Sequence, residues 1–323
     1  MTDAAAAVSA DAIRAAVTRI PAEFRGSPQF VSEPLTTTLG RPVVVKVESV
    51  NPIGCFKGRG TWLAVERLVA DGEVGESRGM VVASAGNFGQ GVAYAARAAG
   101  VPLTVFASRS ASSVKLNAMR RLGAEVRLAG EDFDAARAAA SEDAVRRGWR
   151  LLVDGEDPWI VIGAGTMALE LTDGVERGQL PALDAVYVPV GNGALIAGVG
   201  TWLKAMSPTT RVIGVQAERA PAMALSWQQG RPVETETADT VADGIASRVP
   251  VPEALALMRR TVDDMLLVSE VAILEAQDEL RAALPVTVEP SAAAAWAAAR
   301  QAGASSGAVG IILTGGNVPP QEA

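Results

Sequence analysis

Short apolar runs rich in β-branched residues alternate with alanine-rich amphipathic stretches along most of this chain. Strands are predicted at 80–84, 103–108, 150–154, 185–190 and 211–217, and the helical stretches that follow them lie at 89–100, 112–123, 165–175, 195–206 and 221–230. Strict alternation of this kind is typical of parallel strands joined by crossover helices. Because the strands are apolar along almost their whole length, we expect helices on both faces of the sheet. The pattern therefore predicts an α/β protein.

One long stretch, Gly230 to Pro252, interrupts this alternation because its periodicity is weak. Loops above roughly 12–15 residues are often functional, but they can also be merely irregular. The stretch is therefore interpreted either as a lid over a binding site or as an ordinary solvated loop.

Composition narrows the classes of chemistry that the chain can perform. At 323 residues with 49% hydrophobic content, it is long enough for one large domain or for two lobes that share a cleft. The net charge of −7 argues against nucleic acid as a partner. The absence of histidine excludes Ser-His-Asp hydrolysis and imidazole metal sites, and the single cysteine excludes a thiolate zinc centre in one chain. A small-molecule partner is expected.

The apolar stretches do not predict a membrane protein. Residues 185–203 and 301–321 approach membrane length, but Pro and Gly residues divide each of them. The N-terminal stretch carries Asp3, Asp11 and Arg14, unlike a signal peptide. A single unpaired cysteine fits a reducing compartment. We therefore expect no membrane partner and a cytoplasmic location.

The first candidate site is the segment from Asn51 to Gly60, with sequence NPIGCFKGRG. Its proline and three glycines favour tight turns around the amine of Lys57, and Phe56 can exclude water. A desolvated lysine beside another cation, here Arg59, loses part of its preference for the charged form, as a Schiff-base amine requires. Lys57 is the candidate catalytic amine.

Three further segments place glycines or a hydroxyl after a predicted strand. They are Ser84–Gly91 (SAGNFGQG), Val188–Gly198 (VPVGNGALIAG) and Ile311–Asn317 (IILTGGN). A turn from strand to helix aims backbone N–H groups at an anion, although a glycine turn needed only for close packing has the same pattern. With the recessed lysine, the three segments match a phosphorylated aromatic aldehyde that carries an amino acid.

A competing pattern lies at Gly163–Ala168, which fits the dinucleotide fingerprint G-x-G-x-x-A after the apolar residues Trp159–Ile162. Alone it suggests an NAD oxidoreductase. The acidic residue expected about 20 positions later is best matched by Asp184, which precedes the next strand instead of ending it.

Together, these segments resemble the serine/threonine dehydratase family of fold-type II (tryptophan synthase β-like) pyridoxal-phosphate enzymes over nearly the whole chain. The matching segments are Cys55–Gly60, Ser84–Asn87, Lys115 with Met119–Val126, Gly165–Leu171, Ala242–Gly244 and Val288–Ser291. A GxGT helix start belongs to the same family pattern and accounts for Gly163–Ala168.

The resemblance implies an α/β fold of two open parallel-sheet lobes, with pyridoxal 5'-phosphate in the cleft between them. The expected division is a large cofactor-binding domain of residues 1–78 and 158–323 and a small substrate-binding domain of residues 79–157. Lys57 would be the Schiff-base lysine and catalytic base. The other implied cofactor-binding residues are Phe56, Asn87 at the ring hydroxyl, Gly191, Asn192, Gly193 and Ala194 at the phosphate, and Thr314 at the pyridine nitrogen; the implied substrate-binding residues are Ser84, Ala85, Gly86 and Asn87.

The implied activity is an ammonia-lyase (dehydratase) that eliminates water from L-threonine, L-serine or a related β-hydroxy amino acid. A β- or γ-replacement enzyme, cysteine synthase-like or threonine synthase-like, is the alternative. In related serine racemases a serine matches Ala85 and delivers a proton to the face opposite the lysine, so alanine favours elimination. A homodimer is expected because dimers are common in the family.

Several residues depart from the family pattern. Cys55 replaces a serine, Phe88 a common histidine, and Asn192 and Ala194 two glycines of the phosphate loop. Gln216 and Ala222 stand where some relatives have the carboxylates that bind a divalent cation, so no such metal is predicted, although Glu218 is left open as a ligand of a differently placed cation. No regulatory domain is expected after Ala323.

Overall fold

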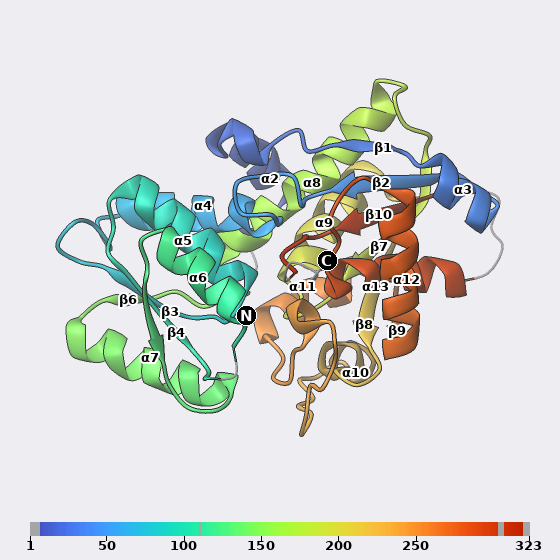
Figure 1. The fold of residues 1–323 in the computed structure, drawn as a ribbon. Helices are drawn as coiled ribbons and strands as arrows, with labels where there is room; N and C mark the ends of the chain where they lie inside the picture. Colours follow the sequence, from blue (N-terminus) through green and yellow to red (C-terminus); the bar gives the residue numbers. More distant parts are fainter. Residues whose placement is uncertain (1–6, 110, 303–306, 319–323) are drawn as a thin grey trace.

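The computed structural model describes residues 7–109, 111–302 and 307–318, and it contains two separate sheets (Figure 1). The larger sheet has six strands, all parallel except β1, which pairs antiparallel with β2. In spatial order its strands are β1 (Gln29–Val31), β2 (Val43–Val47), β10 (Ala308–Leu313), β7 (Leu183–Pro189), β8 (Arg211–Ala217) and β9 (Asp264–Val268).

The smaller sheet has four parallel strands, and Figure 1 draws it on the left. Its strands in spatial order are β5 (Glu125–Leu128), β4 (Leu103–Ala107), β3 (Met80–Ala83) and β6 (Arg150–Leu151). The helices between them are α5 (Asn87–Ala99), α6 (Ser113–Arg121) and α7 (Phe133–Arg147). The α/β prediction with parallel strands is confirmed.

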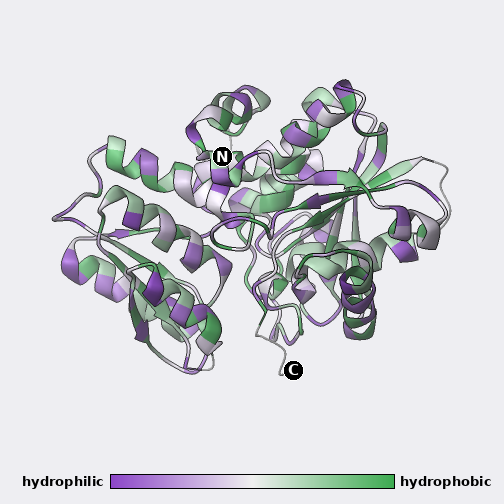
Figure 2. Cartoon of the chain, turned by 45° about the horizontal axis from the view of Figure 1, so that its top comes forward, coloured by the Kyte–Doolittle hydropathy of each residue, from purple (hydrophilic) through white to green (hydrophobic). Residues whose placement is uncertain are grey.

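Helices cover both faces of the larger sheet, as the apolar strands predicted. Alternate residues of one strand enter two different cores: Val186 and Val188 pack with α4, α8 and α9, whereas Ala185 and Tyr187 pack with α12 and α13. Figure 2 shows the resulting pattern, with hydrophobic strands inside and hydrophilic helix faces outside. The helices around this sheet are α2 (Ala10–Ala16), α3 (Glu33–Leu39), α4 (Lys57–Ala70), α8 (Pro158–Glu176), α9 (Ala194–Met206), α10 (Ala222–Gln229), α11 (Pro252–Thr261), α12 (Glu270–Ala283) and α13 (Pro290–Gln301), with short 3-10 turns at Val17–Arg19, Ala22–Phe24 and Asp243–Ile245.

The glycines of the dinucleotide-like pattern lie inside a helix, not at a turn from strand to helix. Residues 159–162, which would form the strand of an NAD site, belong to α8. A Cβ on Gly163 would lie 2.5 Å from the Cα of Gly60, and one on Gly165 would lie 2.9 Å from the carbonyl oxygen of Gly198. These glycines therefore allow α8 to pack closely against α4 and α9, which removes the structural basis for an NAD oxidoreductase.

The stretch from Gly230 to Pro252 is irregular apart from the 3-10 turn at Asp243–Ile245. Within the described residues, no helix is both long and apolar enough to cross a membrane. Residues 1–6, part of the N-terminal stretch discussed above, lie outside the described residues, as do residues 303–306 and 319–323 of the apolar stretch 301–321 and the chain end.

Candidate active site

A cavity of about 660 Å³ is lined by residues that follow strands of both sheets. Ten predicted site residues line it: Phe56, Lys57, Ser84, Ala85, Gly86, Asn87, Gly191, Asn192, Gly193 and Thr314. Ala194, the first residue of α9, has a buried methyl group and is not part of the lining. The cavity size is in the usual range for small-molecule sites, about 300–1,000 Å³.

The loop that precedes Lys57 is held in shape by one side chain and by the end of β10. The Asn51 side chain accepts from the backbone N–H of Ile53 and donates to the carbonyl oxygens of Glu48 and Cys55. The backbone N–H of Phe56 donates to the carbonyl oxygen of Thr314 at 3.0 Å. The loop is thereby attached to the carboxyl end of β10, where Thr314 lines the cavity. The helix α4 then begins at Lys57.

The amine of Lys57 projects into the cavity and contacts a carboxylate. Its Nζ lies 2.9 and 2.6 Å from the two carboxylate oxygens of Asp154, and the side chain is 12% exposed. The rings of Phe56 and Phe88 lie 5.0 and 5.8 Å from Nζ, within the range of cation–π attraction. Asp154 was not among the predicted site residues, although it ends the predicted strand 150–154, where parallel strands present functional side chains.

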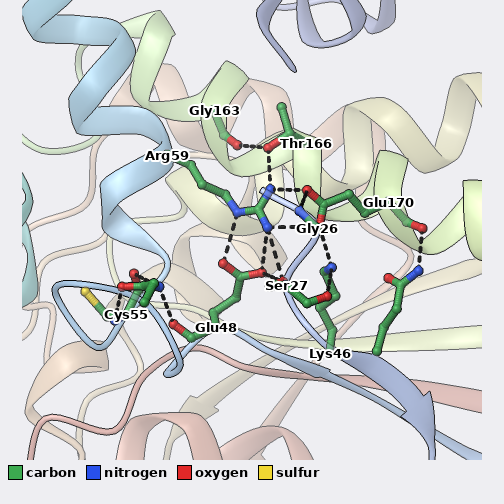
Figure 3. A network of polar contacts seen from close by, with 11 residues as sticks. Gly26, Ser27, Lys46, Glu48, Cys55, Arg59, Gly163, Thr166 and Glu170 are labelled. Atoms are coloured by element: carbon green, nitrogen blue, oxygen red, sulfur yellow. Dashed lines mark hydrogen bonds and ion pairs between the residues drawn. The ribbon is translucent and has the colours of Figure 1, made fainter. Parts of the chain in front are cut away.

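Arg59 is engaged in a buried ionic network and does not act as the cation beside Lys57 that its sequence position suggested. Its guanidinium donates to both carboxylate oxygens of Glu48 and of Glu170, and Lys46 also pairs with Glu170 (Figure 3). Burial opposes ionisation of Glu170, but Arg59 and Lys46 outweigh it and hold the pKa of Glu170 down at about 2. These ion pairs attach α4 to α8 and to the end of β2, and they neutralise the charge of Arg59. The charged partner of Lys57 is Asp154.

Asn87 is held from both ends of its amide at the start of α5. Its Nδ2 donates to the carboxylate oxygens of Glu289 at 2.9 and 3.2 Å, and its Oδ1 accepts from Nδ2 of Asn317 at 2.8 Å. Burial raises the pKa of Glu289 to about 7, despite the opposing effects of the Lys115 ammonium and the Asn87 hydrogen bond. Glu289 matched the family pattern in the sequence, but no role had been predicted for it.

The loop after β3 is shaped by the hydroxyl of Ser84. Its Oγ accepts from the backbone N–H groups of Gly86 at 3.2 Å and Gly89 at 2.9 Å. The loop leads directly into the N-terminus of α5, whose first N–H groups lack partners within the helix and favour an anion such as a carboxylate. Ser84 thus shapes the loop, whereas Ala85 presents a methyl group at the cavity.

The loop after β7 forms a cradle at the N-terminus of α9. Gly193 has φ +94°, a conformation that favours glycine, and a Cβ there would lie 2.7 Å from the sulfur of Met258. The side chain of Asn192 accepts from the N–H of Ala194 at 3.1 Å, so the residue that replaces a glycine binds the first N–H of α9, whose N-cap is Gly193. A helix N-terminus with close backbone access fits a phosphate, and the Lys57 amine in the same cavity fits an aldehyde.

The stretch Gly230–Pro252 forms part of the cavity wall and is tied by ion pairs to helices that flank the smaller sheet. Lys115 on α6 pairs with Asp243, and Arg248 pairs with Asp134 on α7. These contacts join elements on both sides of the cavity, which favours the lid interpretation of this stretch over that of an ordinary loop.

Comparison with known proteins identifies the class of enzyme. Residues 21–315 match the family described as pyridoxal-phosphate dependent enzymes, and the chain belongs to this family. Its cofactor is therefore pyridoxal phosphate, as predicted. The donor set described above, an amine, an amide, a hydroxyl and a helix N-terminus, fits this cofactor.

Two curated relatives are named L-threonine ammonia-lyase. The protein from Thermotoga maritima is 36% identical over 288 residues, which cover 89% of this chain and 70% of the relative. That from Geobacter sulfurreducens is 35% identical over 308 residues, which cover 95% and 75% of the two chains.

A solved structure confirms the predicted fold type. The processed form of threonine deaminase isoform 2 from Solanum lycopersicum aligns with a TM-score of 0.86 at 31% identity, over 96% of this chain and 89% of its own. The fold is that of a fold-type II pyridoxal-phosphate enzyme with two open parallel-sheet lobes.

Proposed function

We propose that this enzyme is an ammonia-lyase that eliminates water from L-threonine, L-serine or a related β-hydroxy amino acid to give a 2-oxo acid and ammonia. The observation that carries the proposal is the shared cavity where the Lys57 amine meets both glycine loops and Thr314. Relatives named L-threonine ammonia-lyase support the same reaction.

The proposed role of each side chain follows from its chemistry and place. When bound, pyridoxal phosphate supplies the electron sink that stabilises negative charge at the substrate Cα. Lys57 holds the cofactor aldehyde and, once the substrate amine has displaced it, takes the proton from Cα. The loop Gly191–Ala194 at the N-terminus of α9 binds the phosphate, and the loop Ser84–Asn87 at the N-terminus of α5 binds the substrate carboxylate.

Three further contacts orient the cofactor ring in this proposal. Asn87 faces the ring oxygen with the side-chain amide whose nitrogen also contacts Glu289. The hydroxyl of Thr314 faces the pyridine nitrogen as a neutral partner. Phe56, whose ring lies 5.0 Å from Nζ, shields the Lys57 amine from water.

The charges around the cavity favour a substrate with an uncharged side chain. In the described part of the chain, each cation that lines the cavity is paired with an acid of the protein itself: Lys57 with Asp154, Lys115 with Asp243, Arg137 with Glu156, and Arg248 with Asp134. A second carboxylate, as in hydroxyaspartate, would compete with one of these acids for its cation. Threonine and serine are therefore the proposed substrates.

We also propose the domain division and the assembly that the sequence suggested. Residues 79–157, which contain the smaller sheet, form the substrate-binding domain, and residues 1–78 with 158–323 form the cofactor-binding domain. We propose a cytoplasmic homodimer, and light scattering coupled to size-exclusion chromatography measures its mass.

The proposed function is tested with a panel of amino acids, each with and without an added thiol nucleophile. We expect 2-oxo acid and ammonia from L-threonine and L-serine, whereas a new thioether would favour a β-replacement enzyme. Lys57→Ala should abolish turnover. Borohydride reduction and peptide mapping should place the cofactor on Lys57; cofactor on Lys115 or Lys204 would refute the assignment.

A further inference from the structure

Asp154 has no role in the function proposed so far, yet both of its carboxylate oxygens contact the Lys57 amine, at 2.9 and 2.6 Å. It lies between β6 and α8 and lines the cavity. Its side chain is 25% exposed, so the carboxyl group is open to a molecule in the cavity and is not sealed in a structural ion pair.

The chain next to Asp154 is packed against the loop assigned to the phosphate. A Cβ on Gly155 would lie 3.1 Å from the side chain of Asn192 and 3.4 Å from that of Val251. This contact holds the backbone at residue 155 in place. Asp154 is thereby fixed close to two groups at once, the Lys57 amine and the phosphate loop.

Elimination of water needs a proton on the departing oxygen, because hydroxide is a poor leaving group. Lys57 must approach the substrate Cα to about 3–3.5 Å to take its proton, and the β-oxygen is two bonds from that carbon. An oxygen 2.6 Å from Nζ is therefore within reach of a β-oxygen whose Cβ–O bond is directed towards Asp154. The chain has no histidine that could carry this proton.

We infer that Asp154 is the proton donor to the departing β-oxygen, an inference that rests on the proposed lyase function. Lys57 takes the proton from Cα and passes it to the Asp154 carboxylate, and the carboxyl then delivers it to the oxygen. The Cα–H and Cβ–O bonds break, the Cα=Cβ π bond and the new O–H bond form, and water departs. The carboxylate and the neutral amine are regenerated without an external acid.

Two substrates separate the role of Asp154 as a proton donor from a role in which it only positions Lys57, because only one of the two leaving groups needs a proton. L-Serine loses its β-substituent as water, whereas β-chloro-L-alanine loses chloride, which needs no proton; both yield pyruvate. For Asp154→Asn we expect kcat/KM to fall about 100-fold or more with L-serine and less than about threefold with β-chloro-L-alanine. Asp154→Glu keeps a carboxyl group and should retain more turnover of L-serine than Asp154→Asn.

Glu236→Gln is the matched control, because it removes the same charge from an exposed residue at the same cavity. It should leave the ratio of the two substrates unchanged. Equal losses of Asp154→Asn on both substrates would overturn the inference, since Asp154 would then act only through Lys57. Unchanged turnover of L-serine would overturn it as well, since another group would then supply the proton.

A measurement without cofactor checks that the variant has lost the ion pair, and its circular dichroism spectrum must match that of the unmodified chain so that unfolding does not cause the change. In cofactor-free protein, trinitrobenzenesulfonate should label Lys57 faster in Asp154→Asn than in the unmodified chain, because the amine has lost its bidentate partner. An unchanged labelling rate would show that the contact is absent in solution and would overturn the inference. A wild-type enzyme that eliminates chloride but releases no oxo acid from any hydroxy amino acid would instead refute the proposed function.

Discussion

Asn87 and Glu289 are 202 residues apart in the chain, yet the amide nitrogen of Asn87 lies 2.9 and 3.2 Å from the two carboxylate oxygens of Glu289. Asn317 donates to the amide oxygen of Asn87, so the amide cannot rotate without loss of both contacts. Its orientation towards the cavity is therefore set before any cofactor binds.

Glu289 predicts how the stability of the cofactor-free protein depends on pH. Burial raises its folded-state pKa to about 7, above the ordinary value of 4.5. Its contribution to stability is therefore full below the unfolded pKa and is lost as the pH rises through about 7. Relative to Glu289→Gln, the free energy of unfolding should fall by on the order of 1–3 kcal/mol between about pH 4.5 and 8.

Urea unfolding at the two pH values measures this difference. The exposed Glu275→Gln on α12 is the control and should show no such dependence. A constant difference between the wild type and Glu289→Gln would contradict the raised pKa.

Glu170 predicts the opposite dependence in acid. Its pKa is held at about 2, below the ordinary 4.5, so its contribution is present above the unfolded pKa and is lost as the pH falls through about 2. Glu170→Gln removes a partner from Arg59 and Lys46 and should cost about 3–5 kcal/mol near neutral pH. Denaturant titrations should show this cost shrinking as the pH falls below 4.5, whereas Glu176→Gln, exposed on the same helix, should cost little at any pH.

Substitution of Gly193 by alanine should weaken cofactor binding, and the loss should exceed that caused by backbone strain alone. Gly193→Ala puts a methyl group at φ +94° within 2.7 Å of the sulfur of Met258, whereas Gly178→Ala meets similar strain at φ +67° with no atom within 4 Å. Gly178→Ala should lose about 1–2 kcal/mol of stability from strain alone, and Gly193→Ala should lose at least as much, because its methyl group also meets Met258. Only Gly193→Ala should weaken cofactor binding, by about tenfold or more, in a fluorescence titration; unchanged affinity in a folded variant would move the phosphate site elsewhere.

Ala85 predicts elimination with little racemisation. Its methyl group lines the cavity and has no proton to deliver to Cα. L-Serine left after partial turnover should therefore contain very little D-isomer by chiral chromatography. Ala85→Ser should raise the D-isomer fraction several-fold, about 1 kcal/mol in relative barrier; abundant D-serine from the unmodified enzyme would refute the role assigned to Ala85.

Local patterns in the sequence were sufficient for the α/β class, for Lys57 and for the glycine loops that end at the cavity. Apolar runs, helix periodicity and turns rich in glycine depend on residues close together in the chain, and they can therefore be predicted without the fold. The same reasoning missed β1, β2, β5 and β9, because β1 has only three residues and each of the others contains a charged residue within its apolar run.

The partners of the reactive groups were decided by tertiary structure alone. Asp154 lies 97 residues from Lys57, and a long-range ion pair leaves no periodic signal along the chain. Arg59 lies beside Lys57 in the sequence but pairs with Glu48 and Glu170, because α4 carries it into the buried space between β2 and α8. The sequence thus determined which groups are present, and the packing of two sheets and their helices determined which of them meet.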